Sequence, residues 1–472
     1  MYNHTRQYRC TIIRGKSQSE MDNLLPLYAN VIDSVCPCKS EEFASLFNNA
    51  FCAALSSEPT KKTLDNHRTE IAGQLFGMYF TSEDGIVYPS ERTYKFISDS
   101  DTPAFFKDIC YKMQFPNGSQ SFQTVRDRVA NKVNIRQFPF MLKAMLLAKS
   151  EGMTLSKKEI GYYILNSLDV LQGKANPLEV FDAIVADRKN GVERDIKTPN
   201  KESSYDWQHI TEQINLLELA NLIIVDGVSV NLNPREMEAI NLFAEKYAAE
   251  PEFDVYSYDL ESVGARKLFY SDWNIYFARV SEKVKEFDTS AEALGVSVDV
   301  ASIETQEGEK SANTIEIGDE GERFVYEYEK RRVTDFNFRL AGKVIHLGKT
   351  RGLGYDIQSV VAIKGDNAEF VKYIEVKATK RVTAPNINDS SWIDTLNITR
   401  NEWVASQQHR GSYSIFRVYF VRDSVIMFVL ANIAQKQDDG IIQAVPTTYR
   451  LDFSNNAVDE VIYPAGGVVT NA

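Results

Sequence analysis

Apolar residues recur at intervals of three and four along most of the first half of the chain. The spacing is clear over residues 20–55 and 61–76, and it predicts amphipathic helices. Two helices each lead into an apolar run, an Asp-Gly pair and a second apolar run, at Asp84-Gly85 and at Asp226-Gly227. Asp-Gly between apolar runs is a strong hairpin signal, so we expect the order helix, hairpin, helix to occur twice.

This order is typical of a winged helix-turn-helix, in which a recognition helix enters the major groove and the hairpin contacts the DNA backbone. We expect at least one of the two modules to contact DNA, although winged helices also serve as protein-docking modules. A basic cluster lies between them and is a candidate DNA-binding surface. For each of its residues the alternative is a solvated helix face. The cluster consists of Arg126, Arg128, Lys132 and Arg136.

The pattern changes to short apolar strands among helices from about residue 315. The predicted elements are, in order, a helix over 317–329, strands over 343–346, 354–361 and 370–378, a helix from Thr399, and a strand over 413–420. We therefore predict a multidomain protein. Its mainly α N-terminal half carries winged-helix-like modules, and an α/β domain with a mixed central sheet follows.

The expected division of the chain follows these changes of pattern. A polar, acidic stretch over 287–320 has few large apolar side chains and is typical of a linker. The predicted parts are a helical region with the first module (1–120), a second module expected to recognise DNA (121–250), a helical linker (251–311) and the α/β domain (312–472).

Candidate chemistry gathers on two neighbouring strands of the last part. Side chains alternate along a strand, so Glu375 and Lys377 face one way while Ile374 and Val376 face the other. An acid and a base in an apolar strand are costly unless they are paired or used. Asp356 begins the neighbouring strand, with eighteen residues between it and Glu375, and there the two carboxylates can lie side by side.

Two carboxylates held together repel, and a divalent cation relieves that repulsion. Hard oxygen ligands with room for water and phosphate oxygens suit Mg²⁺, for which Mn²⁺ can substitute. The predicted metal ligands are Asp356 and Glu375, completed by Glu322 on the preceding helix. Lys377 would orient or deprotonate the attacking water and stabilise developing negative charge. The predicted catalytic residues are therefore Glu322, Asp356, Glu375 and Lys377.

A plain cross-strand salt bridge is the alternative for the Glu-x-Lys segment taken alone. Two neighbouring features favour a nuclease site instead: Asp356 follows Gly354 at the start of its strand, and an acidic helix precedes that strand. His346 and His409 are isolated in the sequence, and we expect them to be structural or surface residues, because this chemistry needs no histidine.

Composition and charge set limits on the class of protein. The 472 residues are 43% hydrophobic and 25% charged, as in ordinary globular proteins, and no apolar run is long enough to span a membrane. The net charge of −12 argues weakly against nucleic acid, but binding depends on local patches. Five cysteines with no secretory signal favour a reduced, cytoplasmic protein, and the Cys36-Pro37-Cys38 spacing fits no zinc pattern.

The constellation resembles the PD-(D/E)xK nuclease superfamily, whose core carries Asp and then Glu-x-Lys on adjacent strands of a mixed sheet between helices. This resemblance implies that residues 312–472 form a restriction-endonuclease-like nuclease domain. Residues 312–425 resemble the C-terminal domain family named after the plant protein NO VEIN, which is placed in that superfamily. The segments that carry this resemblance are Gly321-Glu322, Gly354-Tyr355-Asp356-Ile357, Tyr373-Ile374-Glu375-Val376-Lys377 and Thr399-Arg400-Asn401-Glu402-Trp403, followed by Tyr413. Asn397-Ile398 departs from the Phe or Leu usual in that family.

Residues 60–240 resemble the DNA-recognition half of AlwI-type restriction endonucleases, in which winged-helix-like modules read the site and a separate domain cuts. The segments are Phe105-Phe106-Lys107, Gln114-Phe115-Pro116-Asn117, Phe138-Pro139-Phe140 and Leu155-Ser156-Lys157-Lys158-Glu159-Ile160.

Together these patterns predict a metal-dependent endonuclease of the restriction or phage-defence type, acting on double-stranded DNA. A homodimer or a defence-system partner is compatible with this hypothesis, and no P-loop for a nucleotide motor occurs in the chain. The alternative is a non-catalytic DNA- or protein-binding subunit of a defence complex that keeps a nuclease-like fold.

Overall fold

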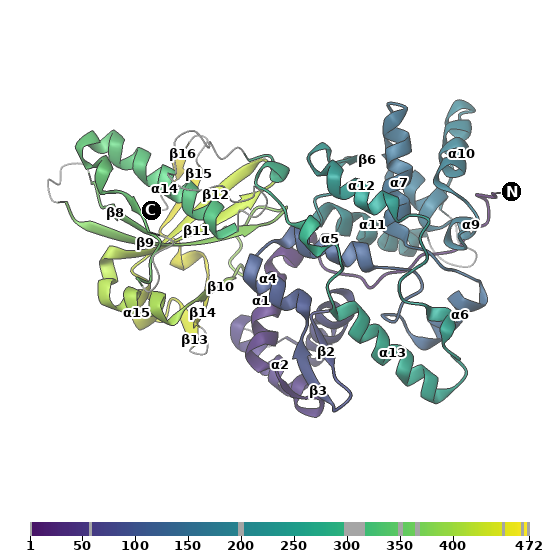
Figure 1. The fold of residues 1–472 in the computed structure, drawn as a ribbon, viewed down its shortest axis with the longest axis horizontal. Helices are drawn as coiled ribbons and strands as arrows, with labels where there is room; N and C mark the ends of the chain where they lie inside the picture. Colours follow the sequence, from purple (N-terminus) through teal and green to yellow (C-terminus); the bar gives the residue numbers. More distant parts are fainter. Residues whose placement is uncertain are drawn as a thin grey trace.

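The computed structural model describes residues 2–55, 59–196, 203–296, 317–347, 353–363, 369–445, 449–463 and 467–469. Figure 1 shows a helical N-terminal part and a C-terminal part built on a sheet, lying next to each other. The predicted helical half and mixed-sheet domain are therefore confirmed. The proposed domain limits stay predictions, and residues 297–316 of the expected linker lie outside the described residues.

The first N-terminal module places three helical segments around a small antiparallel sheet of strand order β1-β3-β2. The hairpin predicted at Asp84-Gly85 is confirmed, and Gly85 takes the positive φ of +75° that its turn requires. The elements are α1 (Gln18–Val35), β1 (Cys38–Lys39), α2 (Ser40–Leu55), α3 (Lys61–Asp65), η1 (Asn66–Leu75), β2 (Tyr79–Thr81) and β3 (Ile86–Pro89).

The second module repeats this strand order as β4-β6-β5, and the hairpin predicted at Asp226-Gly227 is confirmed. Ser156 and Glu159 form a capping box at its second helical segment. The elements are α7 (Gln137–Ser150), β4 (Leu155–Ser156), α8 (Lys157–Glu159), η2 (Ile160–Leu165), α9 (Leu168–Leu171), α10 (Pro177–Lys189), α11 (Ser203–Leu219), β5 (Ile223–Asp226) and β6 (Ser229–Leu232).

Five further helices join the two modules, and one hydrophobic core runs through the N-terminal part from Cys10 to Phe287. Rows of aromatic rings fill it, such as Tyr28 stacked on Phe51. The joining helices are α4 (Glu91–Asp99), α5 (Thr102–Lys112), α6 (Phe122–Ala130), α12 (Met237–Glu245) and α13 (Val263–Ala278).

The C-terminal domain is a seven-stranded mixed sheet of order β16-β15-β12-β11-β9-β8-β7, in which β9 and β11 pair in parallel. Helix α14 covers one face, and α15 with a three-stranded sheet of order β10-β14-β13 covers the other (Figure 1). The main elements are α14 (Ile317–Phe336), β7 (Ile345–His346), β8 (Ile357–Val360), β9 (Val371–Lys380), β10 (Asp394–Ile398), α15 (Arg400–His409), β11 (Tyr413–Val421), β12 (Ser424–Ala431), α16 (Ile433–Asp438), β13 (Gln443–Val445), β14 (Tyr449–Phe453), β15 (Glu460–Tyr463) and β16 (Gly467–Val469).

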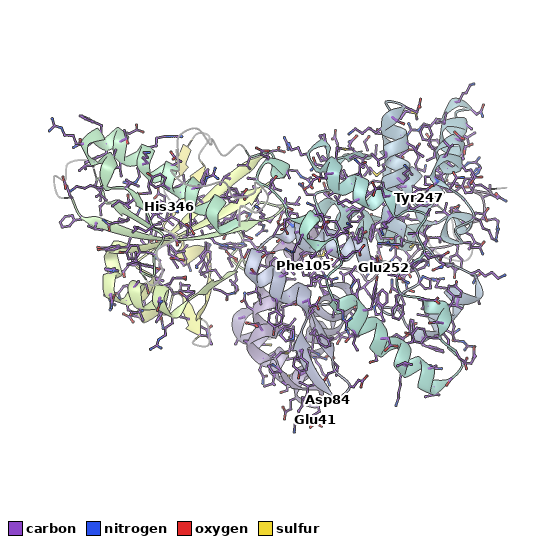
Figure 2. The ribbon with its side chains drawn as sticks, viewed as in Figure 1. Glu41, Asp84, Phe105, Tyr247, Glu252 and His346 are labelled. Carbon is purple, nitrogen blue, oxygen red and sulfur yellow. The ribbon has the colours of Figure 1, made fainter. Side chains whose placement is uncertain are left out.

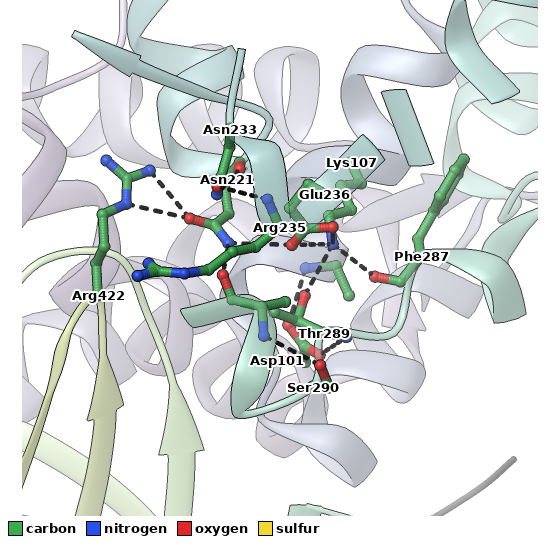
Figure 3. Close-up of polar contacts among 12 residues, drawn as sticks. Asp101, Lys107, Asn221, Asn233, Arg235, Glu236, Phe287, Thr289, Ser290 and Arg422 are labelled. Atoms are coloured by element: carbon green, nitrogen blue, oxygen red, sulfur yellow. Dashed lines mark hydrogen bonds and ion pairs between the residues drawn. The ribbon is translucent and has the colours of Figure 1, made fainter. Parts of the chain in front are cut away.

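Polar contacts dock the two parts, and Arg422 in the turn between β11 and β12 makes the most extensive set. Its guanidinium donates to the side-chain oxygen of Asn221 at 3.0 and 3.1 Å, and to the backbone oxygens of Glu218 and Ile223. Asn221 continues the network to Glu236 (Figure 3). Because an arginine fork is satisfied by several fixed acceptors, this contact sets the orientation of the sheet domain.

A second set of docking contacts lies at the end of β9. The backbone N–H of Lys380 and the hydroxyl of Thr379 both donate to the backbone oxygen of Ser100, at 3.0 and 2.9 Å. Arg381 and Thr383 follow and contact the buried Asp22 carboxylate of α1. The strand that carries the predicted Glu-x-Lys segment therefore ends on the N-terminal part.

Candidate active site

Strands β8 and β9 bring three of the sequence-predicted residues together. The backbone N–H of Asp356 donates to the oxygen of Ile374 at 2.9 Å, and the Asp356 carboxylate accepts from the N–H of Val376 at 2.8 Å. Val376 lies between Glu375 and Lys377, so the two strands fix Asp356 beside the Glu-x-Lys segment. Ile374 and Val376 pack into the core beneath α14, which places Glu375 and Lys377 on the α15 side of the sheet.

Gly354 turns the chain into β8 at a position that only glycine can occupy. Its φ is +75°, and a Cβ there would lie 2.4 Å from the backbone oxygen of Asn401 in α15. The hydroxyl of Tyr413 donates to the Gly354 oxygen at 3.0 Å. The turn before Asp356 is thus clamped between α15 and the start of β11, and this clamp sets where the carboxylate lies.

Lys377 lies between two carboxylates. Its Nζ is 2.7 Å from Oε1 of Glu375 and 2.8 Å from Oε2 of Glu402. Glu402 belongs to the first turn of α15, where Thr399 and Glu402 form a capping box. Sequence reasoning used this segment only as a helix start and missed the contact with Lys377, because no periodicity reports an approach between a helix and a strand 25 residues earlier.

The electrostatics of the site are those of crowded, partly buried carboxylates. Burial raises the pKa of Asp356 to about 6, and the negative charge of Glu322 adds to the shift. Burial also raises the pKa of Glu375 well above its ordinary value, with Asp356 and Glu402 contributing. Glu375 and Glu402 together raise the pKa of Lys377, although burial opposes them. Lys377 is therefore held as an ammonium, which suits it to stabilise negative charge rather than to accept a proton.

Glu322 joins this group from α14. Its carboxylate is near enough to Asp356 to raise the pKa of that side chain, and its Oε2 is 2.7 Å from Nε2 of His346. Glu329, the other acid on this face of the helix, is fully buried and paired with Arg332 and Lys372 instead. Gly321 makes the close approach of α14 to β9 feasible, since a Cβ there would meet Ala378 at 2.5 Å.

His346 lies on β7, the edge strand of the seven-stranded sheet in the C-terminal domain (Figure 2). Its strand is only two residues long, and no sequence pattern links it to Glu322 on α14, 24 residues earlier. The structure adds His346 and Glu402 to the surroundings of the four predicted residues.

The carboxylate oxygens of this site are suitable ligands for a hard divalent cation, but they are few. Within the described residues, no group of three or more His, Cys, Asp or Glu side chains is arranged to hold a metal ion. Mg²⁺ needs fewer protein ligands, because it is usually bound by one or two carboxylates and keeps several waters. Asp356 and Glu375 supply two carboxylates whose pKa values are raised first by burial and then by neighbouring carboxylates, and a bound cation would favour their charged forms.

The basic cluster predicted to bind DNA is largely engaged within the protein. Arg136 is buried and donates to the backbone oxygen of Tyr111. Arg128 contacts the Tyr8 hydroxyl and Asp127, and Arg126 pairs with Glu261. Lys132 is exposed and has a φ of +55°. DNA contact through these residues stays a prediction, and Lys132 is the most accessible of them.

Comparison with known proteins shows the family of the N-terminal part. Residues 2–274 match the family model described as the N-terminal part of restriction endonuclease BpuJI. Among solved structures, the chain is similar to the BpuJ1 endonuclease binding domain, which was crystallised with pyrene- and phenanthrene-modified DNA. The two are 52% identical, the match covers 59% of this chain and 100% of that one, and the TM-score is 0.57. The chain belongs to the family of the BpuJI restriction endonuclease N-terminal domain.

The C-terminal domain is also similar to a known family. Residues 321–430 match the model for the C-terminal domain of protein NO VEIN, which confirms that resemblance. The predicted likeness to a restriction-endonuclease recognition half is confirmed with BpuJI as the relative, while the narrower AlwI type stays a prediction. A search of curated proteins found no match. No helix in the described part of the chain has the length and apolar character needed to cross a membrane.

Proposed function

We propose that this protein is a metal-dependent DNA endonuclease of the restriction or phage-defence type. Residues 2–274 would bind double-stranded DNA, and the C-terminal domain would hydrolyse phosphodiester bonds. The observation that carries the proposal is the hydrogen-bonded placement of Asp356 beside Glu375 and Lys377, in a chain whose N-terminal part belongs to a restriction-endonuclease family.

The DNA-binding half of the proposal is supported by family and by topology. The related BpuJ1 domain is 52% identical and was solved with DNA. In addition, the first strand of each module follows the first helix, and it pairs with the third strand, which belongs to a hairpin that follows the later helices, as in a winged helix. We therefore interpret both modules as winged helices.

The catalytic half rests on the chemistry of the C-terminal site, which we interpret as a PD-(D/E)xK centre. Asp356 and Glu375 would hold Mg²⁺ or Mn²⁺, and Glu322 would add negative charge beside Asp356. When bound, the ion supplies charge neutralisation at the phosphate and a more acidic water. The Lys377 ammonium would donate to the scissile phosphate and stabilise the charge that develops there. Val376 holds Asp356 in place through its N–H.

One site per chain has a consequence for assembly. Cutting both strands of a duplex needs two sites of opposite polarity, so double-strand cleavage would favour a transient homodimer on DNA. A defence-system partner chain is the other way to supply the second site.

The second candidate is a non-catalytic DNA- or protein-binding subunit with a nuclease-like fold. The pairing of Lys377 with both Glu375 and Glu402 favours it, because a lysine satisfied by two carboxylates can serve structure alone. The intact Asp, Glu and Lys set favours the nuclease, since losing any one of them would remove the chemistry.

The experiment is to incubate the full chain with mixed genomic DNA and Mg²⁺ and to sequence the ends produced. We expect ends at a fixed distance from a recurring sequence, and we expect none from Lys377→Ala protein. Equal ends from both proteins would contradict the site. DNA binding with no ends from either protein would support the non-catalytic candidate.

A further inference from the structure

Glu402 joins the start of α15 to the lysine of the candidate site. One of its oxygens, Oε2, is 2.8 Å from Nζ of Lys377 and 3.0 Å from the backbone nitrogen of Thr399. In return, the N–H of Glu402 donates to the Thr399 hydroxyl at 3.3 Å. The carboxylate is therefore fixed by the helix start before it meets the lysine.

Burial makes this contact stronger than a surface ion pair. The side chain of Glu402 is 13% exposed, that of Lys377 22% and that of Glu375 only 4%. Little water reaches these buried charges to screen them, and the attraction between opposite charges grows as the surroundings become less polar. The N-terminal turn of a helix also favours a carboxylate at this position.

The second carboxylate matters because a lysine side chain is flexible. Lys377 carries its charge on a four-carbon stem, and with Glu375 as its sole partner the ammonium would settle fully on that carboxylate. Glu375 is also a proposed ligand of the metal ion. A counter-charge on the opposite side keeps the ammonium between two acceptors and leaves Glu375 less neutralised.

We propose that Glu402 is a positioning residue of the nuclease site, which holds the Lys377 ammonium at the place from which it reaches the scissile phosphate. This inference rests on the proposed function and deepens it. Capping α15 is the competing explanation for Glu402, and the two roles can be separated because they use different properties of the side chain.

Two substitutions distinguish the positioning of Lys377 from the capping of α15. Glu402→Gln keeps the capping box, since glutamine serves at that position as glutamate does, but it removes the negative charge facing Lys377. Thr399→Ala removes the capping hydroxyl but keeps the backbone N–H that holds Oε2 of Glu402. A capping role predicts that Thr399→Ala is the more damaging change, and a positioning role predicts the reverse for cleavage.

The measurements are single-turnover cleavage in Mg²⁺, affinity for the same DNA in Ca²⁺ and the thermal midpoint. For Glu402→Gln we expect cleavage about 10- to 100-fold slower, the loss typical of a supporting partner in a metal site, with unchanged DNA affinity. For Thr399→Ala we expect a midpoint lower by roughly 2–4 °C with cleavage near the wild-type rate. Wild-type cleavage by Glu402→Gln protein would overturn the positioning role and leave the proposed nuclease intact.

A crystal structure of Glu402→Gln protein tests the inference even where the wild type cleaves no DNA, the outcome that contradicts the proposed function itself. We expect α15 to be unchanged and the Lys377 ammonium to have moved onto Glu375. An ammonium in its original place would overturn the inference.

Discussion

The carboxylate of Asp356 accepts a hydrogen bond from the backbone N–H of Val376, the residue between Glu375 and Lys377. This single contact ties the start of β8 to the middle of β9. It fixes the separation of the two carboxylates by backbone geometry, and not only by the preferences of flexible side chains.

Asp356→Asn keeps an oxygen for the Val376 N–H but removes the charge. We therefore expect the fold to persist and binding of Mn²⁺ to be lost, together with a fall in the cleavage rate of about 10²-fold or more. Calorimetric titration with Mn²⁺ checks metal binding, and circular dichroism checks that the variant is folded. A variant that is folded and binds Mn²⁺ as tightly as the wild type would show that Asp356 is not a ligand.

Gly354→Ala tests the clamp that places Asp356. The positive φ alone costs about 1–2 kcal/mol for a residue with a Cβ, and the clash with Asn401 adds to it. We expect a lower thermal midpoint and slower cleavage. Gly411→Ala, at the other end of α15, is the matched control, because a Cβ there would have nothing within 4 Å. Equal behaviour of the two variants would argue against the clamp.

Arg422→Ala tests the docking of the two parts. It would leave the buried Asn221 oxygen and two backbone oxygens without a charged donor, at a cost of about 1–3 kcal/mol. We expect faster proteolysis between the parts and a larger radius of gyration in solution scattering. Arg410→Ala removes an exposed pair with Asp438 and should change neither property. Unchanged scattering from both variants would contradict the docked arrangement.

Protonation of His67 should lower the stability of the N-terminal part as the pH falls. Burial lowers the pKa of this histidine to about 4, and its Nδ1 meets the hydroxyl of Tyr28 in the core. The unfolded chain has the ordinary histidine pKa near 6.5, so it binds more protons than the folded chain between about pH 4 and 6.5. Stability therefore declines as the pH falls through that window.

His67→Gln should flatten that decline, since the variant has no histidine to protonate at this site. The measurement is the thermal midpoint of both proteins at several pH values between 4 and 7. The His67 contribution is the difference between the two slopes, because titration of the other groups is shared. Parallel slopes would contradict the assignment.

Local sequence patterns predicted much of the fold. Asp-Gly pairs predicted both hairpins, and the helix start predicted at Thr399 is confirmed, because these structures depend on residues close in sequence. Strand alternation correctly put Glu375 and Lys377 on one face of β9.

Contacts between distant segments were not predictable in the same way. The approach of Glu402 to Lys377 and the docking of Arg422 on Asn221 depend on how elements pack. The basic cluster shows the same limit. Arg136 reads as a surface charge in sequence, yet it is buried against Tyr111, since a run of charges does not tell which one turns inward.

The most direct test of the central claim is single-turnover cleavage of DNA that contains the recognised site, by wild-type and Lys377→Ala protein, in Mg²⁺ and in EDTA. We expect the wild type to cleave in Mg²⁺ and not in EDTA, and we expect the variant to bind DNA as tightly but to cleave it at least about 10²-fold more slowly. Equal cleavage by both proteins, or cleavage by the wild type in EDTA, would contradict it.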